Sequence, residues 1–406
     1  MITQTLAIFL DAYRELNSRK LFWITMALSG LVVLVYAAIG IDKNGVSFLW
    51  FRLGFIEITS EQMPPELLYK QIFMQLGLGL WLTWIATILA LISTAGIVPD
   101  MITGGSIEML LSKPISRMRL FLTKYAAGLL FATLQVGVFS VACLLVIGIR
   151  GGVWEFKLLL AIPLVIAFFS YLFSFCALVG LLTRSTIAAL LLTILFWFML
   201  FILNSGDAVL VSLKAQLDLK HEALTRQVEQ VRTSTGKLIL RKKEKSGEEV
   251  SKDYVPTDEE IAKFNPWFTT LVDKRDDAAE SLKKLKPWSK SLFAVKTMLP
   301  KTNETILLLE RSLYSIQDLK SAQARIEEKN PDQTAPKSEH TAESNNTKNT
   351  DDAKRSATVN VDQRDVKLKT QEAYRSRSAW WILGTSFAYE AFLLLLSTIL
   401  FSRRDF

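Results

Sequence analysis

Two adjoining stretches decide the fold: LLLAIPLVIAFFSYLFSFCALVGLL at 158–182 and IAALLLTILFWFMLFILN at 187–204. Neither contains a charged side chain, and each is long enough to cross a hydrocarbon core, which takes roughly 17–25 helical residues. Further runs of this kind lie at 21–40, 76–98, 125–148 and 379–401. The six runs together contain one charged side chain, that of Glu390. The sequence therefore predicts an all-α membrane protein with six transmembrane helices.

The charged residues gather in one part of the chain. Residues 205–378 hold 32 Lys and Arg and 28 Asp and Glu, which is 60 of the 86 charged residues in the sequence. A single soluble globule is excluded, because the other 232 residues hold only 26 charged side chains and include the six apolar runs. We expect a transmembrane domain with the first five spans at 1–204, a large polar insertion at 205–378, and a sixth span with a tail at 379–406.

The basic residues beside the short loops predict the orientation. If the N-terminus is cytoplasmic, ten Lys and Arg flank the spans inside and five lie in the short outer loops. Both termini are then cytoplasmic, the insertion is extracytoplasmic, and the chain lies in the inner (plasma) membrane. Four basic residues before the last span, between Lys367 and Arg377, argue for the opposite orientation, but long loops largely escape this rule.

An amphipathic pattern precedes the first span. Residues 2–16 place apolar side chains at spacings of three and four, with charged residues opposite. This pattern is typical of a helix that lies in the membrane interface, and also of an ordinary start to a long helix.

Within the insertion, helical periodicity is strong near 208–232 and near 303–329. Residues 330–372 have almost no large apolar side chains, so we expect this stretch to be disordered. Lysines around Trp288 fit either contact with lipid headgroups or a solvated helix face. The two helices fit either a satellite bundle without chemical role or an arm that docks an extracytoplasmic protein partner.

The segment between the second and third spans has a distinctive pattern. Gly104 and Gly105 are expected to break the descending helix, and Ser106 can cap a short new helix that ends before Pro114. The apolar side of this helix comprises Ile107, Leu110 and Leu111. Glu108 and Lys113 are then exposed to a partner on the cytoplasmic side.

This segment, GGSIEMLLSKPISRMRLFLTK at 104–124, resembles the signature of type-2 (ABC-2-like) ATP-binding-cassette transporter permeases. In that family a glycine, an acidic residue, Leu-Leu-Ser, Pro-Ile-Ser-Arg and a lysine recur at this place. The closing LFSRRDF at 400–406 and MLP at 298–300 are similar to the family as well. The resemblance covers 1–204 and 379–406, and the most similar subgroup includes nitrous-oxide-reductase maturation and gliding-motility permeases.

The resemblance implies a separate cytoplasmic ABC ATPase subunit as partner, and a permease dimer. It assigns the ATPase-coupling role to Gly104, Gly105, Ile107, Glu108, Leu110, Leu111, Lys113, Pro114 and Arg117. The insertion of about 170 residues is much longer than the usual outer loop of the family, so the substrate of a relative does not transfer simply to this chain.

Catalytic motifs are missing from the sequence. No Gly-x-x-x-x-Gly-Lys-Ser/Thr phosphate loop occurs, and the two histidines, His221 and His340, both lie in the polar insertion. We therefore expect no enzyme activity, no metal and no cofactor in this chain, with ATP hydrolysed by the partner. No basic block stands out from its acidic neighbours, which argues against nucleic acid. Cys143 and Cys176 lie in apolar runs and are expected to be core residues.

Glu390 lies near the middle of the last apolar run, next to Tyr389. An acidic side chain at this depth is expected to face the helix bundle or to be protonated. One hypothesis is a polar lining of a substrate path or a protomer interface. The other is a neutral glutamic acid hydrogen-bonded to a neighbouring hydroxyl.

Two functions of different classes remain open. The first is a permease subunit that moves an unidentified substrate, as an exporter, driven by the ATPase. The second is a non-transporting scaffold or mechanotransducer that links an ATPase to a cell-envelope partner through its outer helices.

Overall fold

A computed structural model describes residues 14, 20–42, 45–49, 51–52, 64–103, 116–246, 254–313 and 361–403. The chain divides into two compact units. The first, here called the membrane unit, comprises 1–201, 297–336 and 378–406. The second, the polar unit, comprises 202–296 and 337–377. The predicted interfacial helix at 2–16 lies outside the described residues, except for Arg14.

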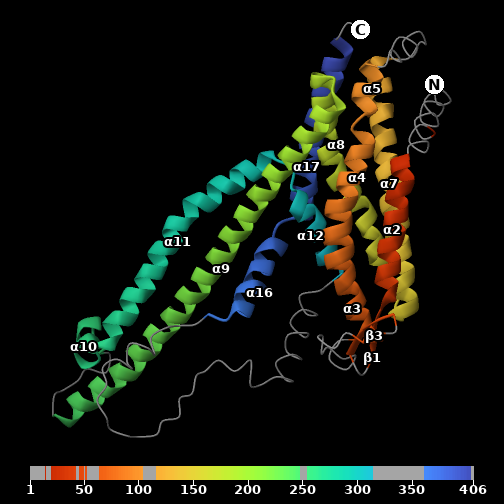
Figure 1. Cartoon of the computed structure of the whole chain (residues 1–406). Coiled ribbons are helices and arrows are strands. Elements are labelled where there is room, and N and C mark those ends of the chain that lie inside the picture. The colour runs from red at the N-terminus through yellow and green to blue at the C-terminus, as the bar shows by residue number, and fades with distance from the viewer. Residues whose placement is uncertain are drawn as a thin grey trace. The chain divides into compact units, whose positions relative to one another are not determined.

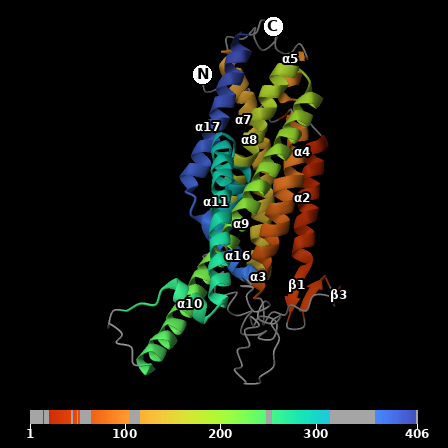
Figure 2. The same cartoon turned by 90° about the vertical axis from the view of Figure 1, so that its left-hand side faces the viewer.

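The membrane unit is a bundle of helices that run side by side (Figures 1 and 2). In chain order its elements are α2 Lys20–Ala38, α3 Pro65–Ile72, the π-helical segment η1 Phe73–Ala86, α4 Thr87–Thr94, α5 Ile97–Thr103, α7 Arg117–Arg150, the short 3₁₀ helix η2 Phe156–Leu160, α8 Ala161–Thr183, the start of α9 Thr186–Lys245, α12 Thr302–Leu313 and α17 Ala379–Arg403. Helix α8 lies at the centre, because it packs against α5, α7, α12 and α17.

Six helical stretches in the described part of the chain are long and apolar enough to cross a membrane. They are Lys20–Ala38, Pro65–Ile102, Arg117–Arg150, Phe156–Thr183, Thr186–Lys245 and Ala379–Arg403. Five of them contain a predicted apolar run in full, and the first ends two residues before the run at 21–40 does. Three of them, at 65–102, 117–150 and 186–245, extend well beyond their run. A helical, multi-pass membrane fold follows from these lengths and compositions.

Aromatic side chains fill the core of the membrane unit. Trp197 of α9 stacks on Trp84 of η1 at 4.7 Å between ring centroids, and Tyr125 of α7 stacks on Phe173 of α8 at 5.0 Å. Gly128 of α7 faces the same Phe173, whose ring leaves no room for a Cβ atom there. Close approach of α7 and α8 therefore depends on a small residue at 128.

A small antiparallel sheet follows α2, although the sequence predicts helices alone. Strand β1 Ile39–Asp42 pairs with β2 Gly45–Phe48, which pairs with β3 Phe51–Arg52. Positive φ angles at Gly45 and Leu49 turn the chain at both ends of β2. Tyr69 donates a hydrogen bond to the carbonyl oxygen of Ile39 at 2.6 Å, which ties the sheet to α3. Strands this short give no distinctive period.

Helix α12 belongs to the membrane unit, whereas the sequence places 303–329 in the insertion. It is preceded by Lys301, whose side chain is fully buried, with its ammonium 4.4 Å from the ring centre of Trp381. The backbone N–H of Lys301 donates to Ser386 Oγ at 2.9 Å. The apolar periodicity of α12 is thus satisfied by α8 and α17. Residues 314–329 lie outside the described part.

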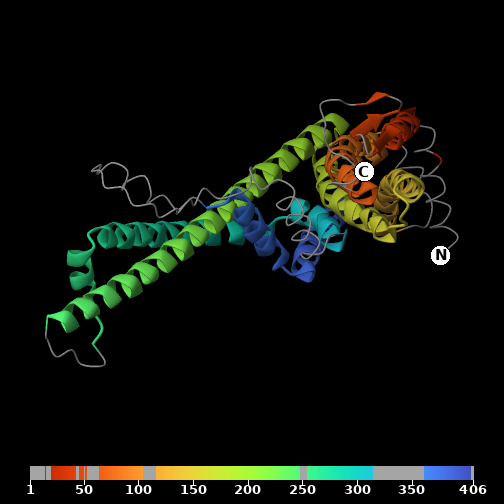
Figure 3. The same cartoon turned by 90° about the horizontal axis from the view of Figure 1, so that it is seen from below.

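The polar unit contains α10 Asp258–Phe264, α11 Trp267–Met298 up to residue 296, α16 Gln363–Arg375 and most of α9. Helices α9 and α11 lie side by side and α10 joins their ends (Figures 1 and 3). They share a separate small core of Leu224, Val228, Ile239, Ile261, Phe268, Leu271 and Ala278. The helix predicted near 208–232 is the middle of α9, and its Leu224 and Val228 are buried as the heptad spacing indicates.

Helix α16 differs from the prediction of disorder over 330–372. It begins after Asp362, whose carboxylate accepts from the N–H of Arg364 at 2.9 Å. Val366 is buried, and Lys369 pairs with Glu222 of α9 at 2.7 Å. Composition alone misses such a helix, because polar contacts such as that of Lys369 with Glu222, rather than a broad apolar face, hold it.

Candidate functional site

Most of the predicted ATPase-coupling segment, including Gly104 through Pro114, lies outside the described residues. Arg117 is described as the first residue of α7, which Ser116 caps by accepting from the N–H of Arg119 at 3.4 Å. The guanidinium of Arg117 donates to the carbonyl oxygen of Ser402, at the end of α17, at 3.4 Å. The coupling role of the whole segment stays a prediction.

Glu390 is buried in the membrane unit, where it joins three helices. Tyr125 of α7 donates to its Oε1 at 2.8 Å, and Ser170 of α8 contacts its Oε2 at 2.8 Å. Tyr389, one residue earlier, faces another neighbour and stacks on Phe196 at 6.2 Å. The structure therefore does not bring Tyr389 and Glu390 into one site.

The protons around Glu390 can be counted. The hydroxyl of Tyr125 also contacts the carbonyl oxygen of Ser170 at 3.1 Å. The hydroxyl of Ser170 contacts the carbonyl oxygen of Ala167 at 2.8 Å. The two hydroxyl groups thus make four contacts in total, two with Glu390 and two with carbonyl oxygens. If Glu390 is ionised, only the two hydroxyl protons are available for these contacts. If Glu390 is neutral, its carboxyl proton is a third. A neutral Glu390 donates from Oε2 to Ser170 Oγ, which frees Ser170 to donate to Ala167. The geometry fits a neutral glutamic acid.

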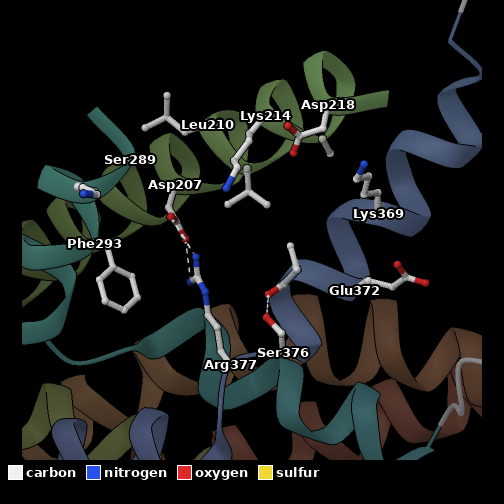
Figure 4. A pocket seen from close by; sticks show the side chains of 14 residues that line it. Asp207, Leu210, Lys214, Asp218, Ser289, Phe293, Lys369, Glu372, Ser376 and Arg377 are labelled. Atoms are coloured by element: carbon white, nitrogen blue, oxygen red, sulfur yellow. Dashed lines mark hydrogen bonds and ion pairs between the residues drawn. The ribbon is translucent and has the colours of Figure 1, made fainter. Parts of the chain in front are cut away.

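The polar unit contains a second buried acid, Asp207 of α9. Lys296 donates to its Oδ2 at 2.8 Å, and Arg377 donates to both oxygens at 2.9 and 3.3 Å. Figure 4 shows Arg377 reaching up to Asp207 from the segment after α16. We call these three residues the Asp207 ion cluster. It joins α9, the end of α11 and the approach to α17.

A pocket of about 580 Å³ opens beside this cluster, between α9, α11 and α16. Its lining combines apolar, basic and acidic side chains. The lining residues are Asp207, Leu210, Val211, Lys214, Ala215, Asp218, Ser289, Lys290, Phe293, Lys369, Glu372, Ala373, Ser376 and Arg377. In Figure 4 the side chain of Lys214 points from α9 into this space. The described lining suits binding, because it contains no nucleophile paired with a base.

Metal chemistry finds no support in the described ranges. No group of three or more His, Cys, Asp or Glu side chains lies close enough there to hold an ion.

No pattern in the sequence indicates the pocket or the partners of Glu390. Tyr125 and Ser170 lie 265 and 220 residues away from Glu390 along the chain. The Asp207 ion cluster left a weak signal. Asp207 comes three residues after an apolar run, and Arg377 comes two residues before another. Charged residues at such junctions are candidates for mutual contact.

Comparison with known proteins identifies one domain. Residues 53–234 match the family model described as ABC-2 family transporter protein. No curated protein and no solved structure matches the chain. The matched range covers four of the six long apolar stretches in full or in part, and includes the segment at 104–124 whose motif resembles ABC-2 permeases. This chain is a multi-pass membrane protein, and its residues 53–234 are similar to the ABC-2 family of transporter proteins.

Proposed function

We propose that this chain is the permease subunit of an ATP-binding-cassette exporter, driven by a separate cytoplasmic ATPase. The observation that carries the proposal is the match of residues 53–234 to the ABC-2 family transporter model. The motif at 104–124, which resembles the signature of ABC-2 permeases, also supports the proposal. The subgroup that the chain resembles most includes nitrous-oxide-reductase maturation and gliding-motility permeases. ATP hydrolysis belongs to the partner, because the sequence has no phosphate loop.

In this proposal both termini and residues 104–117 face the cytoplasm of a cell with the chain in its inner membrane. Two permease chains work as a dimer. ATP binding and hydrolysis in the partner move the segment at 104–113. This movement changes the packing of α5 and α7, so that the helix bundle opens to the extracytoplasmic side of the membrane. The chain makes and breaks no covalent bond.

Co-purification from native membranes tests the partner. We expect an ABC ATPase to accompany the wild-type chain, and the double variant Glu108→Ala/Leu111→Ala to lose it. The control Glu244→Ala/Leu238→Ala removes the same two side-chain types from exposed positions on α9 and should keep the ATPase. If no ATPase accompanies the wild type from its native membranes, the permease proposal fails.

A second candidate function is a mechanical transducer, in which ATPase strokes act on a cell-envelope partner through the polar unit. The observation that favours it is the separate core shared by α9, α10 and α11, which makes this unit more than a loose loop. Replacing 226–276 by a short glycine–serine linker removes most of this core, and keeps α12 and the Asp207 ion cluster. A transducer then retains ATPase stimulation and loses envelope function. Unchanged function in the cell rejects it.

A further inference from the structure

We infer that the pocket between α9, α11 and α16 binds the headgroup of an anionic lipid. Its volume of about 580 Å³ lies within the range of roughly 300–1,000 Å³ for ligand pockets. The inference requires only that the apolar start of α9 crosses a bilayer. It therefore stands apart from the proposed transport and from the ATPase.

The charges of the lining leave two ammonium groups available. Within the described ranges, Asp207 is occupied by Arg377, and Lys369 by Glu222. Lys214 of α9 and Lys290 of α11 form no ion pair there. Two cations on facing helices match a phosphate group, which accepts hydrogen bonds and carries negative charge.

The acidic lining residues lie on both sides of the pocket. Figure 4 shows Asp218 and Glu372 on the side of Lys369, and Asp207 with Arg377 on the side of Phe293. The charge of Asp207 is already paired with Lys296 and Arg377.

The other part of the lining is apolar. Leu210 and Val211 of α9 line the pocket together with Phe293 of α11, which is 43% exposed. A free inorganic anion makes no use of these side chains, whereas a lipid places glycerol and the first methylenes of its chains against them. The lining therefore suits an amphiphile with an anionic end.

The position along α9 agrees with a headgroup. The apolar run ends at Asn204, so Leu210 and Lys214 follow it by about 9 and 15 Å of helix. The headgroup layer extends about 5–8 Å beyond the hydrocarbon on each side. Because helical side chains lean toward the N-terminus, Lys214 extends back toward the apolar run. An ammonium group there meets a lipid phosphate of the leaflet at which this apolar run ends.

Lipid retention in nanodiscs tests the inference. The full-length protein is reconstituted in equal parts of phosphatidylglycerol and phosphatidylcholine, and the lipids that remain bound are counted by native mass spectrometry. We expect the wild type to retain phosphatidylglycerol preferentially. The variant Lys214→Gln/Lys290→Gln should bind it on the order of tenfold more weakly, since each lysine near a charged surface contributes about 1 kcal/mol.

Two further variants separate the pocket from general surface charge. Lys220→Gln/Lys283→Gln removes one exposed lysine from each of the same two helices, outside the pocket, and should bind phosphatidylglycerol like the wild type. Ala373→Trp fills the pocket from α16 without changing its charge, and should also lose the bound lipid. Thermal unfolding of each variant shows that the fold is kept.

Three outcomes overturn the inference. The first is equal retention of phosphatidylcholine by the wild type. The second is an equal loss from the pocket pair and the control pair, which indicates surface charge alone. The third is displacement of the lipid by soluble glycerol 3-phosphate at matched concentration, which indicates a site for a free anion. None of these outcomes depends on an ATPase or on transport.

Discussion

The two units each bury an acid, but surround it differently. Glu390 in the membrane unit is 8% exposed and Asp207 in the polar unit is 5% exposed. Hydroxyl groups contact Glu390, whereas two cations contact Asp207. A neutral acid bound to hydroxyls is tolerated in hydrocarbon, and a charge needs a partner charge when it loses water. A buried acidic residue thus contributes to each unit, through hydrogen bonds with hydroxyl groups in one and through ion pairs in the other.

The largest effect is expected from Asp207→Asn. The change removes the charge shared by Lys296, whose side chain is buried, and Arg377, whose side chain is 14% exposed. Breaking a buried ion pair costs roughly 3–5 kcal/mol, so the polar unit should unfold much more readily. Hydrogen exchange of the amides in α11 and α16, followed by mass spectrometry, measures this.

Glu222→Gln is the matched control for this prediction. It removes an acid that pairs with Lys369 in a largely exposed position, where an ion pair contributes about 1 kcal/mol or less. If Asp207→Asn and Glu222→Gln show equal exchange rates, burial of the ion pair is not what makes Asp207 important for stability.

A smaller effect is expected from Gly128→Ala in the membrane unit. The added Cβ atom comes within 2.6 Å of the Phe173 ring and 3.1 Å of Ile97. Overpacking of this kind costs about 1–3 kcal/mol, which lowers the midpoint of thermal unfolding in detergent. Gly137→Ala on the same helix meets no atom within 4 Å and should leave the midpoint unchanged or raise it. If both variants behave alike, close packing at 128 is not what holds α7 to α8.

Glu390→Gln makes the same chemical change as Asp207→Asn and is expected to do much less. The amide replaces a neutral acid, accepts from Tyr125 and donates to Ser170, so stability should change by about 1 kcal/mol or less. A loss comparable to that of Asp207→Asn indicates an ionised Glu390 instead. If the variant folds, its transport activity tests whether Glu390 lines a substrate path. Unchanged transport rejects a role for the Glu390 charge there.

The smallest effect concerns pH in the polar unit. A hydrogen bond from Tyr254, followed by one from Lys243, lowers the pKa of Glu260 below its usual value of 4.5. A lowered pKa means that folding favours the ionised form. The stabilisation is therefore present above the usual value and is lost as the pH falls through the folded-state pKa.

The protection of the α10 amides, which is the intrinsic exchange rate at each pH divided by the observed rate, should accordingly fall below about pH 4.5 in the wild type. In Glu260→Gln this protection should be lower at neutral pH and respond less to acid. An unchanged acid response in the variant assigns the effect to other groups.

The sequence predicted the helices of the membrane unit well, because a length of uncharged apolar residues reports directly on a span. The run at 21–40 corresponds to α2 Lys20–Ala38, for example. The heptad-like spacing near 208–232 follows the run at 187–204 directly, which predicts that this helix continues the fifth span outward, and α9 Thr186–Lys245 is one helix through both. The helix runs through 204–207, Asn-Ser-Gly-Asp, although residues of these types often mark a helix boundary.

The contacts within the sites could not be predicted in this way. Lys301 is a charged residue in a polar stretch of sequence, yet it is fully buried against Trp381 and Thr385. Burial of a lysine depends on partners brought together from far along the chain, which periodicity does not contain. The same holds for Ser170, an inconspicuous hydroxyl until α17 places Glu390 beside it.

Both buried acids have a consequence for biosynthesis. Asp207 binds Arg377, which lies 170 residues later in the chain, and Tyr125 binds Glu390, which lies 265 residues later. Translation proceeds at about 5–20 residues per second, so the earlier partners wait many seconds for the later ones to leave the ribosome. Until then, α7, α8 and the start of α9 must stay in the membrane without the interactions that close each unit. Residues 377–390 therefore supply the last partners of both buried acid sites, long after α7, α8 and α9 have been made.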